Sequence, residues 1–366
     1  MKTAFLAITF LHGLIHLLGF VKGMGIKEVK ELTLPISKPM GFLWLAAAIL
    51  LMTFGILQLL HSKYAWLAGF AAVCISQILI ILFWKDARFG TLPNMLILLV
   101  SVISYAHFNF QRLVQQEITQ LVQQLEPEDN RVIRENDLGD LPGPVKNWLR
   151  KSGAVGRSSI SIGKVTQKAD MKMKPEQADW MSATATQYTT IYIPAFIWTV
   201  EVKMNSLLSA VGRDKFENGK GEMLIKLNSL LSVVHEKGEK IDEGSLQRYL
   251  GEMVWFPSLA LSPYIRWEPI DDSAAKATLT YKGTTGSGTF HFNSRGEVTA
   301  FSALRYKGNE STAKRHEWIM NITDYKSFEG IKVPCKMTAT WKMDGGDWTW
   351  LRLEVTDIQY NSNALH

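Results

Sequence analysis

Two histidines near the start of the chain have the type and spacing that point most directly to chemistry. His12 and His16 are one helical turn apart within an apolar stretch, which places both side chains on the same face of a helix. Histidines on the helices of a bundle hold haem, metals or quinones. No second histidine lies at a matching depth in the other apolar stretches. Interhelical hydrogen bonding is therefore the favoured interpretation, with a cofactor site at His12 and His16 as the alternative. We expect no cofactor.

Tryptophans are the second notable set, and they gather in the C-terminal two thirds of the chain. A tryptophan-rich core is the simpler interpretation, because large aromatic side chains dominate ordinary cores. The alternative is an aromatic surface that holds an apolar guest. In that case we expect the ligand to contact Trp198, Trp255, Trp318, Trp341 and Trp350.

Patterns typical of an enzyme are absent from the same part of the sequence. Gly283 to Gly288 resembles a phosphate-binding loop only superficially, since it lacks the spacing and the helix of such loops, and we predict a hairpin there. His316-Glu317 lacks the second histidine of a zinc protease motif. Asp271-Asp272 is typical of a turn. We therefore expect neither catalytic residues nor a metal site.

The elements that must position these residues fall into two parts. Each of four apolar stretches is close to the roughly 20 residues that a helix needs to cross a bilayer. We predict membrane-spanning helices over about Ala4 to Val21, Met40 to Leu60, Tyr64 to Trp84 and Leu92 to Phe110. The first ends in Gly19-Phe20-Val21-Lys22-Gly23 rather than in the small residues of a signal cleavage site, so we expect it to be retained.

Lysine and arginine placement indicates the orientation of these helices. Three basic residues flank the side shared by the two ends of the membrane part, and six flank the other side; Arg131 and Arg134 narrow the count to five against six. This bias places the loops around 26–39 and 85–90 in the cytoplasm. The C-terminal domain is then expected outside it.

Net charge and cysteine content give two further expectations, about nucleic-acid partners and about disulfides. The net charge of +6 is dispersed and accompanies no nucleic-acid-binding motif, so we expect no nucleic-acid partner. Cys74 lies in the third apolar stretch and Cys335 in the C-terminal part, which makes a disulfide between them improbable.

Beyond the membrane part the periodicity changes twice. We predict an amphipathic helix and a linker over 112–140 and a β domain over 141–366. Within that domain a short helix is expected at Pro144 to Lys151, and a period of two begins at Ser158, as in Phe196 to Met204 and Cys335 to Met343. One helix, from about Glu243 to Met253 with Asp242 as its cap, interrupts the strands. The expected architecture is therefore a four-helix membrane module, 1–111, followed by an α+β domain with a curved, mainly antiparallel sheet.

Several runs of sequence are similar to an uncharacterised bacterial family of membrane-anchored proteins, whose domain has no known function. They include Leu141 to Arg150, Arg248-Tyr249-Leu250, Trp255-Phe256-Pro257, Arg266 to Asp272, Gly330 to Pro334, His12 to Phe20, Pro35 to Pro39 and Ser76 to Trp84. More distantly, the order of strands and turns resembles the periplasmic lipoprotein-carrier (LolA-like) architecture. That resemblance implies a curved sheet closed by helices around a lipid-sized cavity.

The sequence therefore favours an integral membrane protein with an extracytoplasmic β domain that binds lipid or another apolar ligand without covalent chemistry. Two alternatives remain open. One is a membrane oxidoreductase that uses His12 and His16, and the other is a structural or signalling module whose sheet docks a protein partner.

Overall fold

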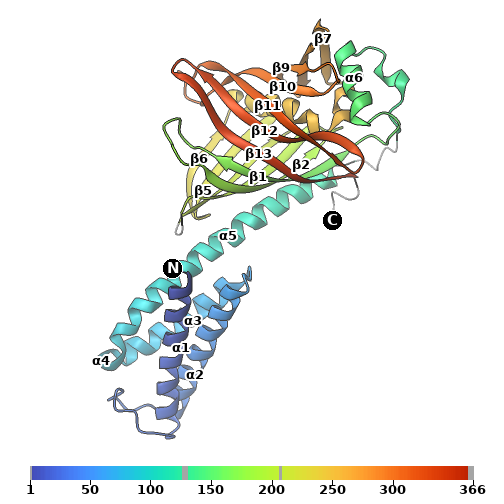
Figure 1. Cartoon of the computed structure of the whole chain (residues 1–366). Helices are drawn as coiled ribbons and strands as arrows, with labels where there is room; N and C mark the ends of the chain where they lie inside the picture. The colour runs from blue at the N-terminus through green and yellow to red at the C-terminus, as the bar shows by residue number, and fades with distance from the viewer. Residues whose placement is uncertain (1, 126–130, 206–207, 362–366) are drawn as a thin grey trace. The chain divides into compact units, whose positions relative to one another are not determined.

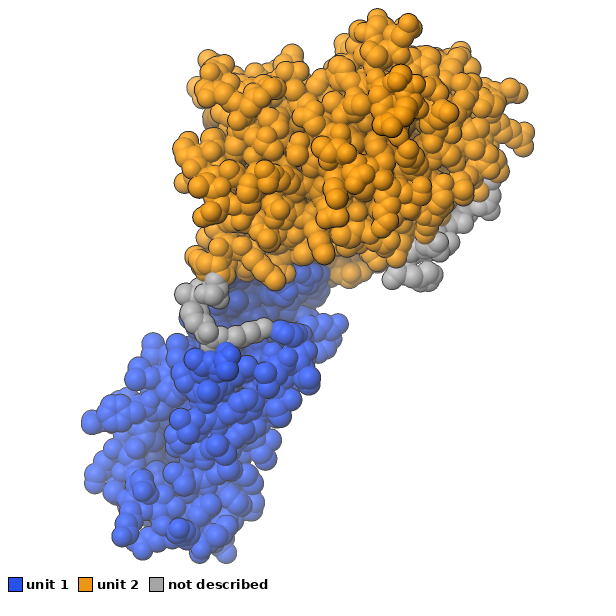
Figure 2. Space-filling model, viewed as in Figure 1, with its two compact units in different colours: residues 1–112, 228–230 blue, residues 113–227, 231–366 orange. Residues whose placement is uncertain are grey.

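The structure, a computed structural model, describes residues 2–125, 131–205 and 208–361. The chain divides into two compact units (Figure 2). The first contains residues 1–112 and 228–230, and the second contains residues 113–227 and 231–366. We describe each unit by itself.

The first unit is helical. Its elements are α1 (Lys2–Gly23), α2 (Lys38–Leu59), α3 (Ala65–Leu82), α4 (Trp84–Ala87), η1 (Arg88–Gly90) and the first part of α5 (Thr91–Gln123). Among the described residues, four helical segments are long and apolar enough to cross a membrane: Thr3–Gly23, Lys38–Leu59, Ala65–Leu82 and Trp84–Gln123. Side chains such as Leu11, Ile49 and Leu92 are exposed on the outside of this unit, as expected of a surface that faces lipid. We call it the membrane unit.

Close approach of α1 and α2 depends on glycine. A Cβ atom on Gly19 would lie 2.2 Å from the Trp44 ring, and one on Gly23 would lie 2.8 Å from the Cα of Gly41. Small residues are favoured between membrane helices because packing, rather than hydrophobic burial, holds such helices together.

The second unit, which we call the β domain, contains one antiparallel sheet. In the described residues its thirteen strands have the order β6-β5-β4-β3-β2-β1-β13-β12-β11-β10-β9-β8-β7. The sheet is two meanders joined where the first strand pairs with the last, and Figure 1 shows β1 (green) beside β13 (red). The strands are β1 (Ile162–Met171), β2 (Met181–Thr190), β3 (Ala195–Lys203), β4 (Ser209–Glu217), β5 (Lys220–Leu227), β6 (Leu231–Lys237), β7 (Ile265–Asp271), β8 (Ala274–Tyr281), β9 (Thr284–Phe292), β10 (Val298–Tyr306), β11 (Arg315–Phe328), β12 (Ile331–Met343) and β13 (Gly346–Tyr360).

Strand pairs distant in the sheet order approach one another because the sheet is curved. The hydroxyl of Thr284, at the start of β9, donates to the carbonyl of Gly219 in the turn between β4 and β5, at 2.7 Å. Asn309, between β10 and β11, donates to the carbonyl of Lys237 at the end of β6, at 3.0 Å. The expected fold class, apolar helices followed by a curved antiparallel sheet with few helices, is confirmed. The predicted hairpin between β8 and β9 is also present, with Lys282 and Gly283 at positive φ.

Helix α7 (Glu239–Gly251) covers one face of the sheet, with η3 (Glu252–Trp255) and η4 (Pro257–Leu261) following it. Strands β9 and β10 pair only between Thr289–Phe292 and Val298–Ser302. Where they separate, the Gln247 amide nitrogen of α7 donates to the carbonyl of Leu304 at 3.0 Å and to that of Ser287 at 3.4 Å. The helix thus bridges two strands that are not paired there.

The beginning of α7 differs from the sequence-based prediction. The helix starts at Glu239 after Gly238, and Asp242 lies inside its first turn instead of capping it. The Asp242 carboxylate accepts hydrogen bonds from the backbone of Gly221 and from the Lys220 side chain, both at 2.8 Å. Long-range pairing with β5, invisible in local sequence, determines its role.

The opposite face of the sheet packs against the end of α5. Leu121 and Ile118 contact Ala195 and Ile197 of β3. Beside them, Glu117 forms ion pairs with Arg213 at 3.2 Å and with Lys215 at 3.0 Å. The remaining helices of the β domain are η2 (Glu135–Leu138) and α6 (Gly143–Ser152).

Candidate ligand-binding site

A network of charged and amide side chains lies on the α7-covered face. Arg248 of α7 donates to Glu252 at 2.8 Å, to Asp214 of β4 at 2.8 Å and to Gln187 of β2 at 3.0 Å. Gln187 in turn donates to Glu252 at 2.7 Å. The Arg248 guanidinium also stacks over the Trp198 ring at 4.6 Å. Every nitrogen of this guanidinium therefore has a partner.

Burial sets the electrostatics of this network. Burial raises the pKa of Asp214, although the neighbouring Arg248 opposes the shift. The network holds two carboxylates and one arginine, and its hydrogen bonds compensate for the lost hydration of the three groups.

Arg305 of β10 lies on the same face without comparable partners. Its guanidinium stacks over the rings of Trp318 at 4.6 Å and Trp341 at 5.7 Å. One nitrogen donates to the carbonyl of Gly244 at 2.9 Å. Its Nε is buried and has no hydrogen-bond partner among the described residues. Burial, reinforced by the positive charge of Arg248, lowers the pKa of Arg305 to about 10.

Three tryptophans stand directly opposite one another beside Arg305. Trp318 of β11 is paired with Trp341 of β12, which is paired with Trp348 of β13, so their side chains share one face. Trp350 follows at a bulge in β13. The indole nitrogens of Trp318, Trp348 and Trp350 are buried and have no hydrogen-bond partner in the described part of the chain. The rings of Trp341, Trp348 and Trp350 are partly exposed.

The five tryptophans predicted to contact ligand are therefore not all together. Trp318, Trp341 and Trp350 lie on the neighbouring strands β11, β12 and β13. Trp198 stacks on Arg248 and donates to Gln167 at 3.0 Å. Trp255 of η3 is 1% exposed and donates to the carbonyl of Pro334 at 3.1 Å.

Sequence reasoning missed Arg248, Arg305, Asp214 and Glu252. Arg248 is part of a run that carries the family resemblance, but no spacing relates either arginine to tryptophans on other strands. Alternation alone could have placed Arg305 on the same face as Phe301 and Ala303.

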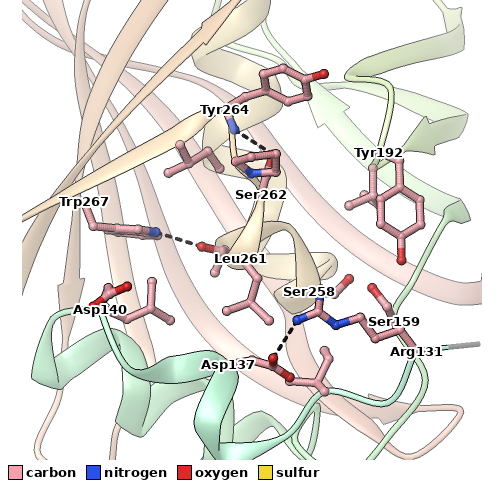
Figure 3. A pocket seen from close by; sticks show the side chains of 16 residues that line it. Arg131, Asp137, Asp140, Ser159, Tyr192, Ser258, Leu261, Ser262, Tyr264 and Trp267 are labelled. Atoms are coloured by element: carbon pink, nitrogen blue, oxygen red, sulfur yellow. Dashed lines mark hydrogen bonds and ion pairs between the residues drawn. The ribbon is translucent and has the colours of Figure 1, made fainter. Parts of the chain in front are cut away.

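Two hollows of ligand size also lie in the β domain. One of about 560 Å³ is formed by η4, the start of β7 and residues 131–141 (Figure 3). Its polar groups are largely satisfied within the protein: Arg131 pairs with Asp137 at 2.6 Å, and Trp267 donates to the carbonyl of Ala260 at 3.0 Å. The second, of about 530 Å³, lies where β9 and β10 separate, and Glu243 and Gln247 of α7 line it.

In the membrane unit, His12 and His16 are both buried. His12 Nε2 lies 3.0 Å from the Asn94 side-chain oxygen, which also accepts from the Ser76 hydroxyl at 3.1 Å. Asn94 donates to Gln77 at 3.0 Å, so polar groups of α1, α3 and α5 join in one network. His16 donates through Nδ1 to the His12 carbonyl at 2.9 Å, and its Nε2 has no partner among the described residues. No cluster of three or more metal-ligating side chains occurs in the described residues.

These features define a helical membrane unit joined to a β domain with an aromatic, arginine-bearing face. Residues 131–353 match a family of unknown function (DUF6544), and the chain belongs to this family. The expected membership of an uncharacterised family is confirmed.

Two solved structures are similar to the chain at low TM-scores. A LolA superfamily protein, NE2245 from Nitrosomonas europaea, has a TM-score of 0.33 and 10% identity, over 60% of this chain and 94% of that one. A beta-barrel-like protein of a domain of unknown function (DUF1849) from Brucella abortus has a TM-score of 0.20 and 8% identity, over 56% of this chain and 99% of that one. The first of these proteins belongs to the LolA superfamily, the architecture that the order of strands and turns resembles. Comparison with the curated proteins gives no match.

Proposed function

We propose that this protein is a multi-pass protein of a bacterial inner membrane whose β domain, outside the cytoplasm, binds lipid or another amphiphilic molecule without covalent chemistry. The observation that carries the proposal is the row of partly exposed rings of Trp341, Trp348 and Trp350 on adjoining strands. Contiguous exposed apolar patches on a protein surface mark interaction or ligand-binding sites.

The two hollows of ligand size do not include the tryptophan row, because Trp318, Trp341, Trp348 and Trp350 line neither of them. Sites for small ligands occupy about 300 to 1,000 Å³, and hollows of about 560 and 530 Å³ lie in the β domain. The polar groups of the larger hollow are mostly paired with protein groups, whereas those beside the tryptophan row are not. We therefore place the ligand against Trp318, Trp341, Trp348 and Trp350.

Binding is tested by mass spectrometry of the small molecules that co-purify with the full-length protein. We expect an amphiphile with the wild type and its loss when Trp341 and Trp350 are both replaced by alanine. A matched control is Trp180→Ala, because the Trp180 ring lies against the exposed Arg352, away from the α7-covered face. Retention of the same molecules by the Trp341/Trp350 variant would contradict the assignment.

The side of the membrane is tested separately. In a chain with Cys74 and Cys335 replaced by alanine, single cysteines at Ser62 and Ser311 are exposed to an impermeant maleimide in spheroplasts. We expect both positions to react, because the charge bias places both on the outer side. Protection of both positions in intact spheroplasts, with labelling only after lysis, would reverse the orientation.

A second candidate function is supported by the buried, unpartnered Nε2 of His16, which could bind a cofactor of a membrane oxidoreductase. Against it, His12 Nε2 is already engaged by Asn94. Absorbance between 400 and 600 nm, metal analysis and quinone extraction of the purified protein test this candidate.

A further inference from the structure

We propose that the ligand of the β domain carries an anionic group, a carboxylate or a phosphate, which binds at Arg305 and the indole N–H groups of Trp318, Trp348 and Trp350. This inference rests on the proposed function and specifies the chemistry of its ligand. It depends on the kind of polar atoms that the α7-covered face leaves unpartnered.

One unpartnered acceptor, the Gln247 Oε1 of α7, lies on this face, and the other unpartnered atoms near Arg305 are hydrogen-bond donors. These donors are the Arg305 Nε and the Nε1 atoms of Trp318, Trp348 and Trp350, each buried and without a partner among the described residues. Guanidinium and indole groups only donate hydrogen bonds. Buried polar groups are paired in the great majority of cases, so the missing partner of this set is an acceptor. An anionic oxygen group is the strongest acceptor that a ligand can bring to such donors.

Among the described residues, the three carboxylates that act on Arg305 do not supply that acceptor. Asp214 and Glu252 are hydrogen-bonded to Arg248, and Glu243 forms an ion pair with Arg315. These three carboxylates act on Arg305 only from beyond ion-pair distance. The positive charge of Arg305 is therefore not paired locally, although the guanidinium is largely desolvated by the tryptophan rings.

A second cation lies along the same row of rings. The Lys307 ammonium is 4.7 Å from the centre of the Trp348 ring, and Lys307 directly follows the end of β10 at Tyr306. The arrangement places positive charge next to apolar rings, which matches a molecule with an acidic head and an apolar chain.

The test uses the full-length protein in nanodiscs of phosphatidylcholine and three probes with the same chain: decanoate, decyl phosphate and decanol. Binding is followed by tryptophan fluorescence and calorimetry, with empty nanodiscs as the reference for partitioning. We expect at least one anion to bind about tenfold or more tightly than decanol, the usual contribution of a charged hydrogen bond. The stronger of the two anions distinguishes a fatty-acid-like ligand from a phospholipid-like one.

Arg305→Gln is expected to abolish the preference for the anion, and Arg352→Gln, which also removes an arginine stacked on a tryptophan, is expected to keep it. Trp318→Phe keeps a ring but removes the N–H, and should weaken anion binding about threefold to tenfold without changing decanol binding. If Arg305→Gln does not fold, the Trp318→Phe variant alone tests whether the anion binds at this site.

The outcomes separate this inference from the proposed function. If decanol binds the wild type as tightly as both anions, the anionic group is refuted while amphiphile binding stands. If none of the three probes binds, the proposed function fails. If anion preference survives in both Arg305→Gln and Trp318→Phe, the anion binds elsewhere and the assigned residues are wrong.

Discussion

Arg248 and Arg305 occupy the same face of one sheet, and each stacks on tryptophan, but their surroundings differ. Arg248 donates to two carboxylates and an amide oxygen. In the described part of the chain, Arg305 donates to the carbonyl of Gly244, and its Nε has no partner. The first arginine belongs to a closed network. The second retains donors that the described protein groups do not use.

The comparison separates polar groups that hold the fold from those available to a ligand. Removing one member of a buried ion pair leaves the other charge uncompensated, which is costly. Removing a group without a partner leaves nothing uncompensated. Trp255 and Trp318 show the same contrast, since the first indole donates to Pro334 and the second has no partner among the described residues.

The largest expected effect comes from Arg248→Met, which strands the carboxylates of Asp214 and Glu252. We expect a loss of about 3 kcal/mol or more in the stability of the β domain, seen as a fall in Tm of about 6 °C or more. Arg305→Met is the matched control and should change the Tm by far less. Thermal unfolding followed by tryptophan fluorescence measures both, and equal losses would remove the distinction between the two arginines.

A smaller effect is expected from the two tryptophans. Trp255→Phe removes the donor to the buried Pro334 carbonyl and should cost about 1 kcal/mol more than Trp318→Phe. Both changes remove a similar volume, so the difference isolates the hydrogen bond. Denaturant titration of the two variants provides the measurement, and a Trp318→Phe variant that is the less stable of the two would show that its N–H has a structural partner.

A separate, pH-dependent effect is expected at a carboxylate on the opposite face, Glu222. Burial by itself raises its pKa, but hydrogen bonds from Arg213 and His235 outweigh burial and lower the pKa to about 2. Because this pKa is below the unfolded value of 4.5, Glu222 stabilises the fold fully above about pH 4.5. That contribution is lost as the pH falls toward 2. As the pH is lowered from 5 to 2, the Tm of Glu222→Gln should therefore fall less steeply than that of the wild type. Parallel curves of Tm against pH would contradict the lowered pKa of Glu222.

Asp214 extends the comparison because its pKa shift has the opposite sign. Burial raises the pKa of Asp214 in spite of Arg248, so its carboxylate favours the fold less, not more, once it ionises. The two carboxylates differ because burial outweighs partners at Asp214 and partners outweigh burial at Glu222.

Much of the fold was predictable because its signals are local. The apolar stretches gave the four long helices, and alternation in Phe196 to Met204 and Cys335 to Met343 gave β3 and β12. The start of α7 was predicted four residues too late, because Asp242 binds the backbone of Gly221 on a distant strand. The sequence shows where the tryptophans are, but not which indole N–H groups have a hydrogen-bond partner. That depends on contacts between residues far apart in the sequence.

The sequence by itself determined that this protein has an apolar helical part and an antiparallel β domain rich in tryptophan, because hydropathy and periodicity act over a few residues. Only the tertiary structure decided that Trp318, Trp341 and Trp348 form one row and that Arg305 lies on it. It also decided that Arg248 rather than Arg305 meets Asp214 and Glu252. Strand register and the position of α7 set the distances between these side chains. Both arise from pairing between residues many positions apart in the sequence.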